Sequence, residues 1–405
     1  MNFLWGLLGI AFVFLVAFLL SSNKNAIKPR TILVGLAIQV LFGFIVLKWN
    51  VGRAALEKVT TAVQNVVNYA NEGISFLFGT LSDASQPTGF IFAFNVLTLI
   101  IFFSSLIAVL YHLGIMQIII KFLGGGLAKL LGTSQTESLS AAANIFVGQT
   151  EAPLVIRPYL PKMTRSELFA VMTGGLASVA GSVLFGYAAL GVPIEYLLAA
   201  SFMAAPAGLI MAKMIIPETE KTSTAEGIAM EKDKDTVNVI DAAARGASDG
   251  LKLALNVGAM LLAFIALIAL LNGLLSGIGS LFNLENFTLD TILGFVFAPI
   301  AFVIGVPWSE AVQAAGFIGQ KFVLNEFVAY SSFAPQIDQL SDKTVAVVSF
   351  ALCGFANLSS LAILLGGLGN MAPSRRPEIA RLGFRAILAG TLANLLSAAI
   401  AGMFI

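Results

Sequence analysis

Two short polar runs interrupt a chain that is otherwise mostly apolar: residues 148–153, GQTEAP, and residues 325–330, NEFVAY. Each run holds one carboxylate, and Glu326 lies 175 residues after Glu151. A carboxylate flanked by amides and hydroxyls can make several hydrogen bonds to a polar ligand. At membrane depth, one charged side chain costs roughly 2.5 to 3.5 kcal/mol on insertion scales. That cost indicates that the two runs serve a function.

Two carboxylates could also act as acid and base in an intramembrane hydrolase. However, no catalytic serine, histidine or metal-ligand pattern accompanies them, and the chain has one histidine, His112, and one cysteine, Cys353. The amides and hydroxyls around Glu151 and Glu326 suit ligand recognition, so we expect no enzyme. Two other interpretations stay open. The runs could line a channel, or each carboxylate could serve only to accept hydrogen bonds from a broken helix.

Interrupted helices must hold the polar runs. Gly148 and Pro153 disrupt helical hydrogen bonding, and freed backbone groups are tolerated at membrane depth only when they are buried in protein or line a cavity. We therefore expect re-entrant hairpins at about 133–163 and 288–334, with the polar runs at or near their tips.

The chain also contains an internal repeat. Each hairpin precedes two apolar segments, the first of which is broken by small or polar residues. The breaks lie at 174–182, GGLASVAGS, and at 353–360, CGFANLSS. Repeated units with helices interrupted at matching positions are the strongest sequence indication of a transport site near the membrane midplane.

Composition limits the class of protein. The 405 residues are 58% hydrophobic and 11% charged, with a mean hydropathy of +0.91, which is typical of a polytopic membrane protein without a sizeable soluble domain. The net charge of +1 and the scattered basic residues argue against a nucleic-acid partner. A single cysteine excludes an intrachain disulfide and a multi-cysteine zinc site.

The hydropathy pattern predicts eight spans and three other segments. Residues 50–87 and 117–131 have the mixed pattern of amphipathic helices, and 217–248 is a polar loop. The predicted spans are 3–20, 31–48, 89–112, 167–190, 194–216, 250–276, 343–371 and 384–405.

Basic residues predict the orientation. With both termini outside the cytoplasm, 18 of the 23 lysines and arginines fall on the inner side, as the positive-inside rule requires. The five assigned to the outer side are Lys48, Arg53, Lys58, Lys321 and Lys343. The ends of the first hairpin then face inward and those of the second outward. The two repeats are therefore inverted, as alternating access needs.

The runs GQTEAP, NEFVAY and CGFANLSS, in this order, closely resemble the concentrative nucleoside transporter family in a bacterial form without extra N-terminal spans. The resemblance extends from about residue 90 to the end. It implies an all-α polytopic membrane protein with eight transmembrane helices and two re-entrant hairpins, and a homotrimer. The implied parts are a scaffold (1–132), a first transport repeat (133–216), a cytoplasmic loop with a scaffold span (217–287) and a second transport repeat (288–405).

The resemblance also implies a substrate site. At the base of a nucleoside it implies Gln149, Thr150 and Glu151, with Val183 packing on the base. At the ribose it implies Glu326, Asn357 and Ser360, and Phe355 would form an apolar wall. Their donors and acceptors match a neutral polar substrate. Expected substrates are uridine and cytidine, with adenosine as a further candidate. The preference between purines and pyrimidines stays open.

By the same resemblance, sodium binds between the first hairpin tip and the first broken helix. Its ligands would be the Asn144 side chain, the Val147 carbonyl, Ser178 and the Val179 carbonyl. Neutral oxygens at an unwound helix suit Na+. The predicted protein imports nucleosides with Na+ by alternating access across the plasma (inner) membrane, with Na+ as coupling ion and no cofactor. The alternative is proton coupling, which some relatives use; Asn144 and the complete GQTEAP run favour sodium.

Overall fold

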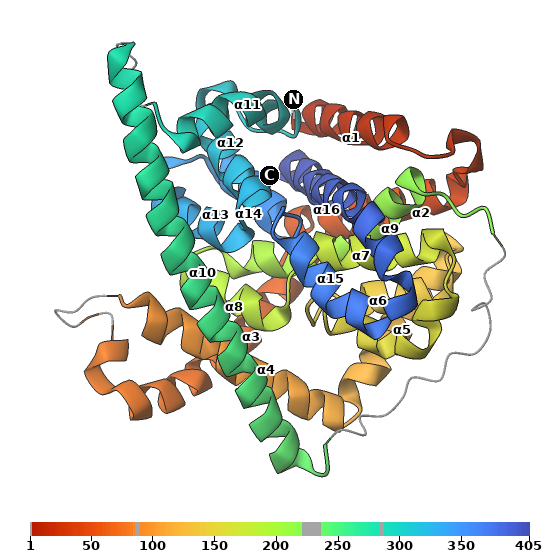
Figure 1. The fold of residues 1–405 in the computed structure, drawn as a ribbon, viewed down its shortest axis with the longest axis horizontal. Helices are drawn as coiled ribbons and strands as arrows, with labels where there is room; N and C mark the ends of the chain where they lie inside the picture. Colours follow the sequence, from red (N-terminus) through yellow and green to blue (C-terminus); the bar gives the residue numbers. More distant parts are fainter. Residues whose placement is uncertain (1, 84, 86–89, 221–235, 283–286) are drawn as a thin grey trace.

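The computed structural model describes residues 2–83, 85, 90–220, 236–282 and 287–405. Within these ranges the regular structure is entirely helical (Figure 1). The predicted polar loop 217–248 lies partly outside the described residues, and its last part is already the start of a helix at Val239. The end of the predicted amphipathic segment, at residues 84 and 86–87, also lies outside them.

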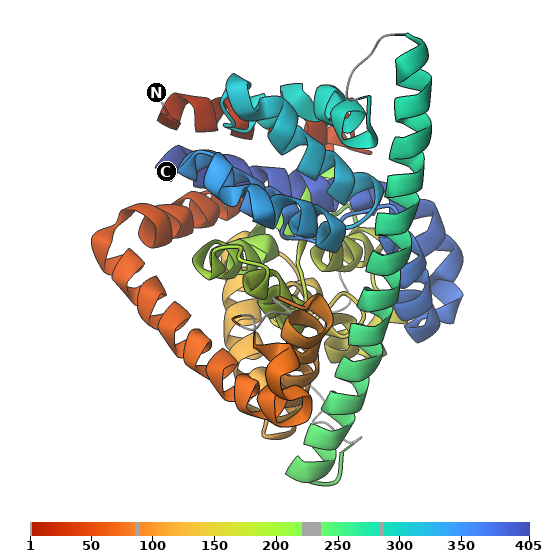
Figure 2. The ribbon, with the colours of Figure 1, turned by 90° about the vertical axis from the view of Figure 1, so that its left-hand side faces the viewer.

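The first helices and one later helix are apolar and mostly exposed, as a membrane-facing set would be. They are α1 (Asn2–Leu19), α2 (Pro29–Gly43) continued by η2 (Phe44–Lys48), η4 (Ala93–Leu97) with α4 (Thr98–His112), and α10 (Val239–Leu281). Between them, α3 (Asn50–Phe78) is the amphipathic helix that the sequence predicts. The 43 residues of α10 extend about 65 Å, and the helix runs along the outside of the molecule in both views, beside α4 (Figures 1 and 2).

Two sets of helices follow the same order along the chain. Each set comprises a leading helix, two hairpin arms, a span in two pieces and a closing span. The first set is α5 (Ile115–Leu131), α6 (Gln135–Ala143), η5 (Ala152–Lys162), α7 (Arg165–Ala177), α8 (Gly181–Ala189) and α9 (Ile194–Ile215). The second is α11 (Leu289–Val303), α12 (Trp308–Val323), α13 (Glu326–Phe333) with η6 (Ala334–Gln339), α14 (Asp342–Leu352), α15 (Ser360–Met371) and α16 (Arg376–Phe404).

The second hairpin begins later than the predicted residue 288. Gly305, with φ of +118°, and Pro307 end α11 and turn the chain by 116° into α12. The hairpin therefore consists of α12 and α13, and its tip lies at Leu324 and Asn325. The helix α11 has the place in the second set that α5 has in the first.

Length and composition give seven helical segments among the described residues that could each cross a membrane alone. The eighth predicted span, 343–371, is present as α14 and α15 but is divided at residues 353–359. The two chain ends lie close to each other (Figures 1 and 2), and Asn2 Nδ2 donates a hydrogen bond of 3.0 Å to the Ile405 carbonyl.

The core sits around α16, which packs against α1, α7, α9, α14 and α15. Most of its residues from Ile379 onward are buried. Gly390 allows the close approach of the two divided spans, because a Cβ there would lie 2.9 Å from Leu176 Cβ and 3.1 Å from Ala356 Cβ. One helix of the second set thus contacts both helix breaks.

Candidate functional site

The first hairpin tip is a compact turn closed by its own carboxylate. A capping box starts the incoming arm, where Ser134 and Glu137 satisfy each other's backbone N–H groups. After α6 ends, Glu151 Oε2 accepts a hydrogen bond of 2.9 Å from the Gly148 N–H. The Glu151 side chain is otherwise exposed, while the neighbouring Gln149 is buried. Glu151 therefore accepts one hydrogen bond from the backbone of its own turn, which is the structural role that the sequence analysis kept as an alternative.

Two buried amide oxygens beside the first tip lack a hydrogen-bond partner in the described structure. They are Asn144 Oδ1 and Gln149 Oε1. Both side chains lie against the glycine pair of α7: a Cβ on Gly175 would come within 2.8 Å of Gln149 Cβ and 3.8 Å of Asn144 Oδ1. Buried polar atoms are normally paired, so these two oxygens are available to a ligand or an ion.

The first helix break follows one turn later. Ser178 is extended, with φ of −111° and ψ of 172°, and its Oγ donates 2.9 Å back to the Gly174 carbonyl. The Gly181 N–H, at the start of α8, donates 3.0 Å to the Phe146 carbonyl in the hairpin tip. This bond ties the tip to the break and places Asn144, Val147, Ser178 and Val179 in one buried region.

The second hairpin tip presents a buried carboxylate. Asn325 caps α13 by accepting 2.9 Å from the Val328 N–H, which is why the helix starts at Glu326. Glu326 is 6% exposed. Its Oε1 accepts 3.0 Å from the Tyr187 hydroxyl, and its Oε2 accepts 3.0 Å from Asn357 Nδ2. One donor therefore comes from each repeat.

The second helix break supplies the rest of this polar cluster. Asn357 Oδ1 accepts 2.9 Å from the Ser360 N–H and 2.7 Å from Ser359 Oγ, and so opens α15. The Phe355 N–H donates 3.1 Å to the Ser178 carbonyl. The two helix breaks therefore lie side by side, and the amide of Asn357 is fixed in orientation by its own turn.

A single amide on α16 caps both breaks. Asn394 Nδ2 donates 2.7 Å to the Ala177 carbonyl and 3.0 Å to the Cys353 carbonyl. Asn394 Oδ1 accepts 2.6 Å from Lys321 Nζ, which also donates 2.8 Å to the Ala351 carbonyl. These bonds satisfy carbonyls that the ends of α7 and α14 leave free.

The structure assembles the predicted residues in two groups. Glu326, Asn357 and Ser360 share one hydrogen-bonded cluster, whereas Asn144 and Gln149 lie against α7 beside the first break. Phe355 is half-buried in the second break, and its carbonyl accepts 2.9 Å from the Asn357 N–H. Thr150 packs against Gly367 of α15, and Val183 is buried in the first turn of α8. The other predicted residues lie at the first tip and the first break, as described above: Glu151, Val147, Ser178 and Val179.

Sequence reasoning missed Tyr187, Lys321 and Asn394. Lys321 was counted among the basic residues of the outer side, and its burial was not predicted: the side chain is 2% exposed and bonded inside the protein. A lysine five residues before a buried carboxylate, in an apolar hairpin arm, was the available signal. His112 lies at a helix end and contacts the Thr236 hydroxyl at 2.7 Å, as an interfacial histidine would.

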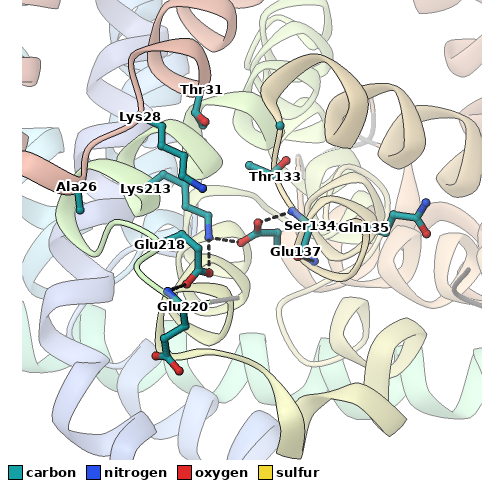
Figure 3. Close-up of a pocket in the computed structure, with 11 residues that line it drawn as sticks. Ala26, Lys28, Thr31, Thr133, Ser134, Gln135, Glu137, Lys213, Glu218 and Glu220 are labelled. Atoms are coloured by element: carbon teal, nitrogen blue, oxygen red, sulfur yellow. Dashed lines mark hydrogen bonds and ion pairs between the residues drawn. The ribbon is translucent and has the colours of Figure 1, made fainter. Parts of the chain in front are cut away.

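A separate charged cavity of about 540 Å³ lies where the base of the first hairpin meets α9 (Figure 3). There Lys213 Nζ is 2.6 Å from Glu137 Oε2, 2.9 Å from Ser166 Oγ and 3.6 Å from Glu218 Oε2. This network joins the first hairpin arm, through Glu137, and the start of α7, through Ser166, to the closing span α9. We interpret it as an anchor of the hairpin base, because its charged groups are paired with one another.

Family models match successive parts of the chain. A model for the N-terminus of Na+ dependent nucleoside transporters matches residues 8–81, a nucleoside recognition model matches 93–193, and a model for the C-terminus of the same transporters matches 196–402. The chain belongs to the concentrative nucleoside transporter family. It is therefore a nucleoside transporter and not an enzyme, and it is a multi-pass membrane protein.

Individual relatives are similar to this transporter along nearly its whole length. It is 64% identical over 406 residues to an uncharacterized transporter of Bacillus subtilis, covering all of both chains. It is 51% identical to the nucleoside permease NupC of Helicobacter pylori, over 99% of this chain and 98% of the permease. Human solute carrier family 28 member 3 is 39% identical over 98% of this chain and 59% of its own length.

Solved structures of the transporter CNTnw have the same fold. One, inward-facing and substrate-bound, is 55% identical with a TM-score of 0.95 and covers 100% of this chain and 98% of that one. A variant of CNTnw in an outward-facing state has a TM-score of 0.97, and the match covers 100% of this chain and 99% of that one. The predicted all-α polytopic fold class is thereby confirmed.

Proposed function

We propose that this transporter imports nucleosides together with Na+ by alternating access. The observation that carries the proposal is the pairing of two sites at adjoining helix breaks. One is a buried carboxylate cluster around Glu326, and the other is a set of neutral oxygens around Asn144. The Phe355 to Ser178 bond joins the two breaks.

The cluster at the second break suits a ribose. The Glu326 carboxylate can accept from two adjacent hydroxyls, and Asn357 and Ser360 beside it add donors and acceptors. Hydrogen bonds to a charged group contribute about 1.5 to 3 kcal/mol each. We therefore assign the ribose to Glu326, Asn357 and Ser360.

The first tip suits a base. Gln149 Oε1 is buried without a partner, and its amide offers a donor beside that acceptor. We assign Gln149, Thr150 and Glu151 to the polar edge of the base, directly or through water, and Val183 and Phe355 to its apolar faces. Uridine, cytidine and adenosine are the candidate substrates.

The first break suits Na+. The Asn144 oxygen is unpaired, and the neighbouring oxygens of Val147, Ser178 and Val179 are neutral. The C-terminal end of α7 adds the partial negative charge that favours a cation. We propose these four residues as the ligands of the coupling ion.

One Na+ is enough for uphill import. A charge moving through about 100 mV gains about 2.3 kcal/mol, and a tenfold inward gradient adds about 1.4 kcal/mol. The sum of about 3.7 kcal/mol sustains a nucleoside gradient of roughly several hundredfold.

We also propose the arrangement around this site. The two repeats, 133–216 and 288–405, form the moving part, and residues 1–132 with α10 form a scaffold that assembles as a homotrimer. The protein lies in the plasma (inner) membrane, and both termini are on the side that faces away from the cytoplasm. Supporting observations are the shared position of the termini and the exposed apolar side chains of α10.

The decisive test is uptake of radiolabelled uridine into proteoliposomes with an inward gradient of Na+, choline or protons. We expect accumulation above the external concentration with Na+ only, and recovery of intact uridine. Equilibration without accumulation would indicate a channel. Accumulation with a pH gradient alone would replace Na+ by protons, and no uptake with any ion would contradict the substrate class.

The ion site gives a separate prediction. Replacing Ser178 with alanine removes one of the proposed ligands, so the Na+ concentration for half-maximal uptake should rise about tenfold, the equivalent of one hydrogen-bond-sized contact of about 1.4 kcal/mol. Uridine uptake measured against Na+ concentration reports this change.

Ser349→Ala is the matched control. Ser349 is also buried and also donates to the carbonyl four residues back, Val345, near the end of α14. The Na+ dependence of this variant should equal that of the wild type. If the Na+ concentration for half-maximal uptake shifts equally in both variants, or does not shift in Ser178→Ala, Ser178 is not part of the ion site.

A further inference from the structure

A lysine is buried beside the second helix break, in the hairpin arm α12 that leads to Glu326. Lys321 is 2% exposed and lies five residues before Glu326. Its ammonium donates to the Ala351 carbonyl, next to the last residue of α14, and to Asn394 Oδ1. Both acceptors are neutral oxygens: the Ala351 carbonyl belongs to the C-terminal end of α14, where a cation is favoured, and Asn394 caps that end through the Cys353 carbonyl.

The two repeats correspond with a constant offset. Glu151 and Glu326 are 175 residues apart, and so are the last residues of the two interrupted helices, Ala177 and Leu352. In each repeat the hairpin meets the helix break, and we call this place the junction. By the constant offset, the junction around Lys321 in the second repeat matches the junction around Asn144, Val147 and Ser178 in the first. Asn394 touches the free carbonyls at both junctions.

The first junction has no cation of its own. Among the described residues, the buried basic side chains are Lys213 and Lys321. Lys213 belongs to the anchor at the base of the first hairpin, where Glu137 and Glu218 pair with it (Figure 3). The first junction therefore offers only oxygens, whereas the second already holds an ammonium.

We propose that Lys321 is a tethered cation which fills, in the second repeat, the place that the coupling ion fills in the first. This inference rests on the proposed Na+ symport. Each repeat then contributes one carboxylate and one cation at the site, Glu151 with Na+ and Glu326 with Lys321. With Na+ and a neutral nucleoside bound, the centre of the moving domain carries no net charge. Without Na+ it carries one negative charge.

A consequence follows for voltage. Movement of the fully loaded domain transfers no net charge, so the membrane potential acts on the return of the empty domain. Removal of the ammonium leaves the loaded domain with one negative charge, and a potential of about 100 mV then biases its position by roughly fiftyfold.

The experiment measures exchange of labelled for unlabelled uridine in proteoliposomes, with saturating Na+ and uridine on both sides, so that only the loaded domain moves. A potassium gradient with valinomycin sets the potential to zero or to about −100 mV. Exchange by the wild type should change by less than about 1.5-fold, and exchange by Lys321→Met should change by at least about fivefold. Lys321→Arg keeps the charge and should behave as the wild type does.

The outcomes separate this inference from the proposed function. If the wild type takes up no uridine with Na+, the proposed function fails. If it does so but its exchange depends on voltage, or if Lys321→Met responds as the wild type does, only the role of Lys321 fails. Should Lys321→Met be inactive, Lys321→Gln replaces it. If Lys321→Met and Lys321→Gln are both inactive, the wild type and Lys321→Arg are compared instead. Exchange that does not depend on voltage in these two proteins supports the inference. Exchange that depends on voltage in either one overturns it.

Discussion

Replacement of Glu326 by glutamine is expected to lower uridine uptake by at least about a hundredfold, while the protein still folds. In the structure both carboxylate oxygens act as acceptors, one for Tyr187 and one for Asn357. Glutamine has the same shape but only one acceptor oxygen and no charge, so it cannot accept from two adjacent ribose hydroxyls as the carboxylate can. Asn357 cannot turn its amide to compensate, because its oxygen already holds the Ser360 N–H.

The measurement is the initial rate of uridine uptake with a saturating Na+ gradient, with elution from a sizing column as the check on folding. Glu310→Gln is the matched control. Glu310 lies in the first turn of α12, the other arm of the same hairpin, and accepts from the Ser341 backbone and hydroxyl near the surface. Its uptake should stay within about twofold of the wild type. Near-normal uptake by Glu326→Gln would remove Glu326 from the ribose site.

Replacement of Asn394 by leucine is expected to destabilise the protein by about 3 to 6 kcal/mol and to abolish most transport. The change leaves the Ala177 and Cys353 carbonyls without their donor and removes one acceptor from Lys321. Each unsatisfied buried group costs about 1 to 3 kcal/mol. Thermal unfolding in detergent should show a midpoint lower by at least about 5 °C.

Ser397→Ala on the same helix is the control for this experiment. Ser397 is equally buried, but its hydroxyl bonds only to the Ala393 carbonyl of its own helix turn. Its melting temperature should therefore change by less than about 2 °C. An Asn394→Leu variant as stable as Ser397→Ala would show that the two helix ends do not need the shared amide.

The sequence predicted the parts of this site that violate local rules. A carboxylate among amides in an apolar chain, as at Glu151 and Glu326, is costly enough to be recognised without a structure. The same holds for Ser178 and Asn357, since the glycine-rich and polar surroundings of each break a span. These features depend on neighbours in sequence, and the structure places each break beside its hairpin tip.

The partners of these residues could not be predicted in the same way. Tyr187 lies 139 residues from Glu326, and Asn394 lies 73 residues from Lys321. A lone lysine or asparagine on a helix has the same local pattern whether it faces water or the core. Burial that depends on contacts between distant helices leaves no periodic signal, so the burial of Lys321 was not predicted. The start of the second hairpin was misplaced for a related reason, because α11 and α12 are both apolar and only the turn at Gly305 divides them.

If the proposed ion and ribose sites hold, the amide that caps both helix breaks makes ion and substrate affinity interdependent. Asn394 holds the carbonyl next to Ser178 and the carbonyl at the start of the second break, and Phe355 bonds across to Ser178. Ordering of one break by Na+ would therefore order the other, where we propose that the ribose binds. Thermodynamic reciprocity then requires that nucleoside tighten Na+ binding by the same factor. The stoichiometric coupling that a symporter needs would thus arise at equilibrium, before the domain moves at all.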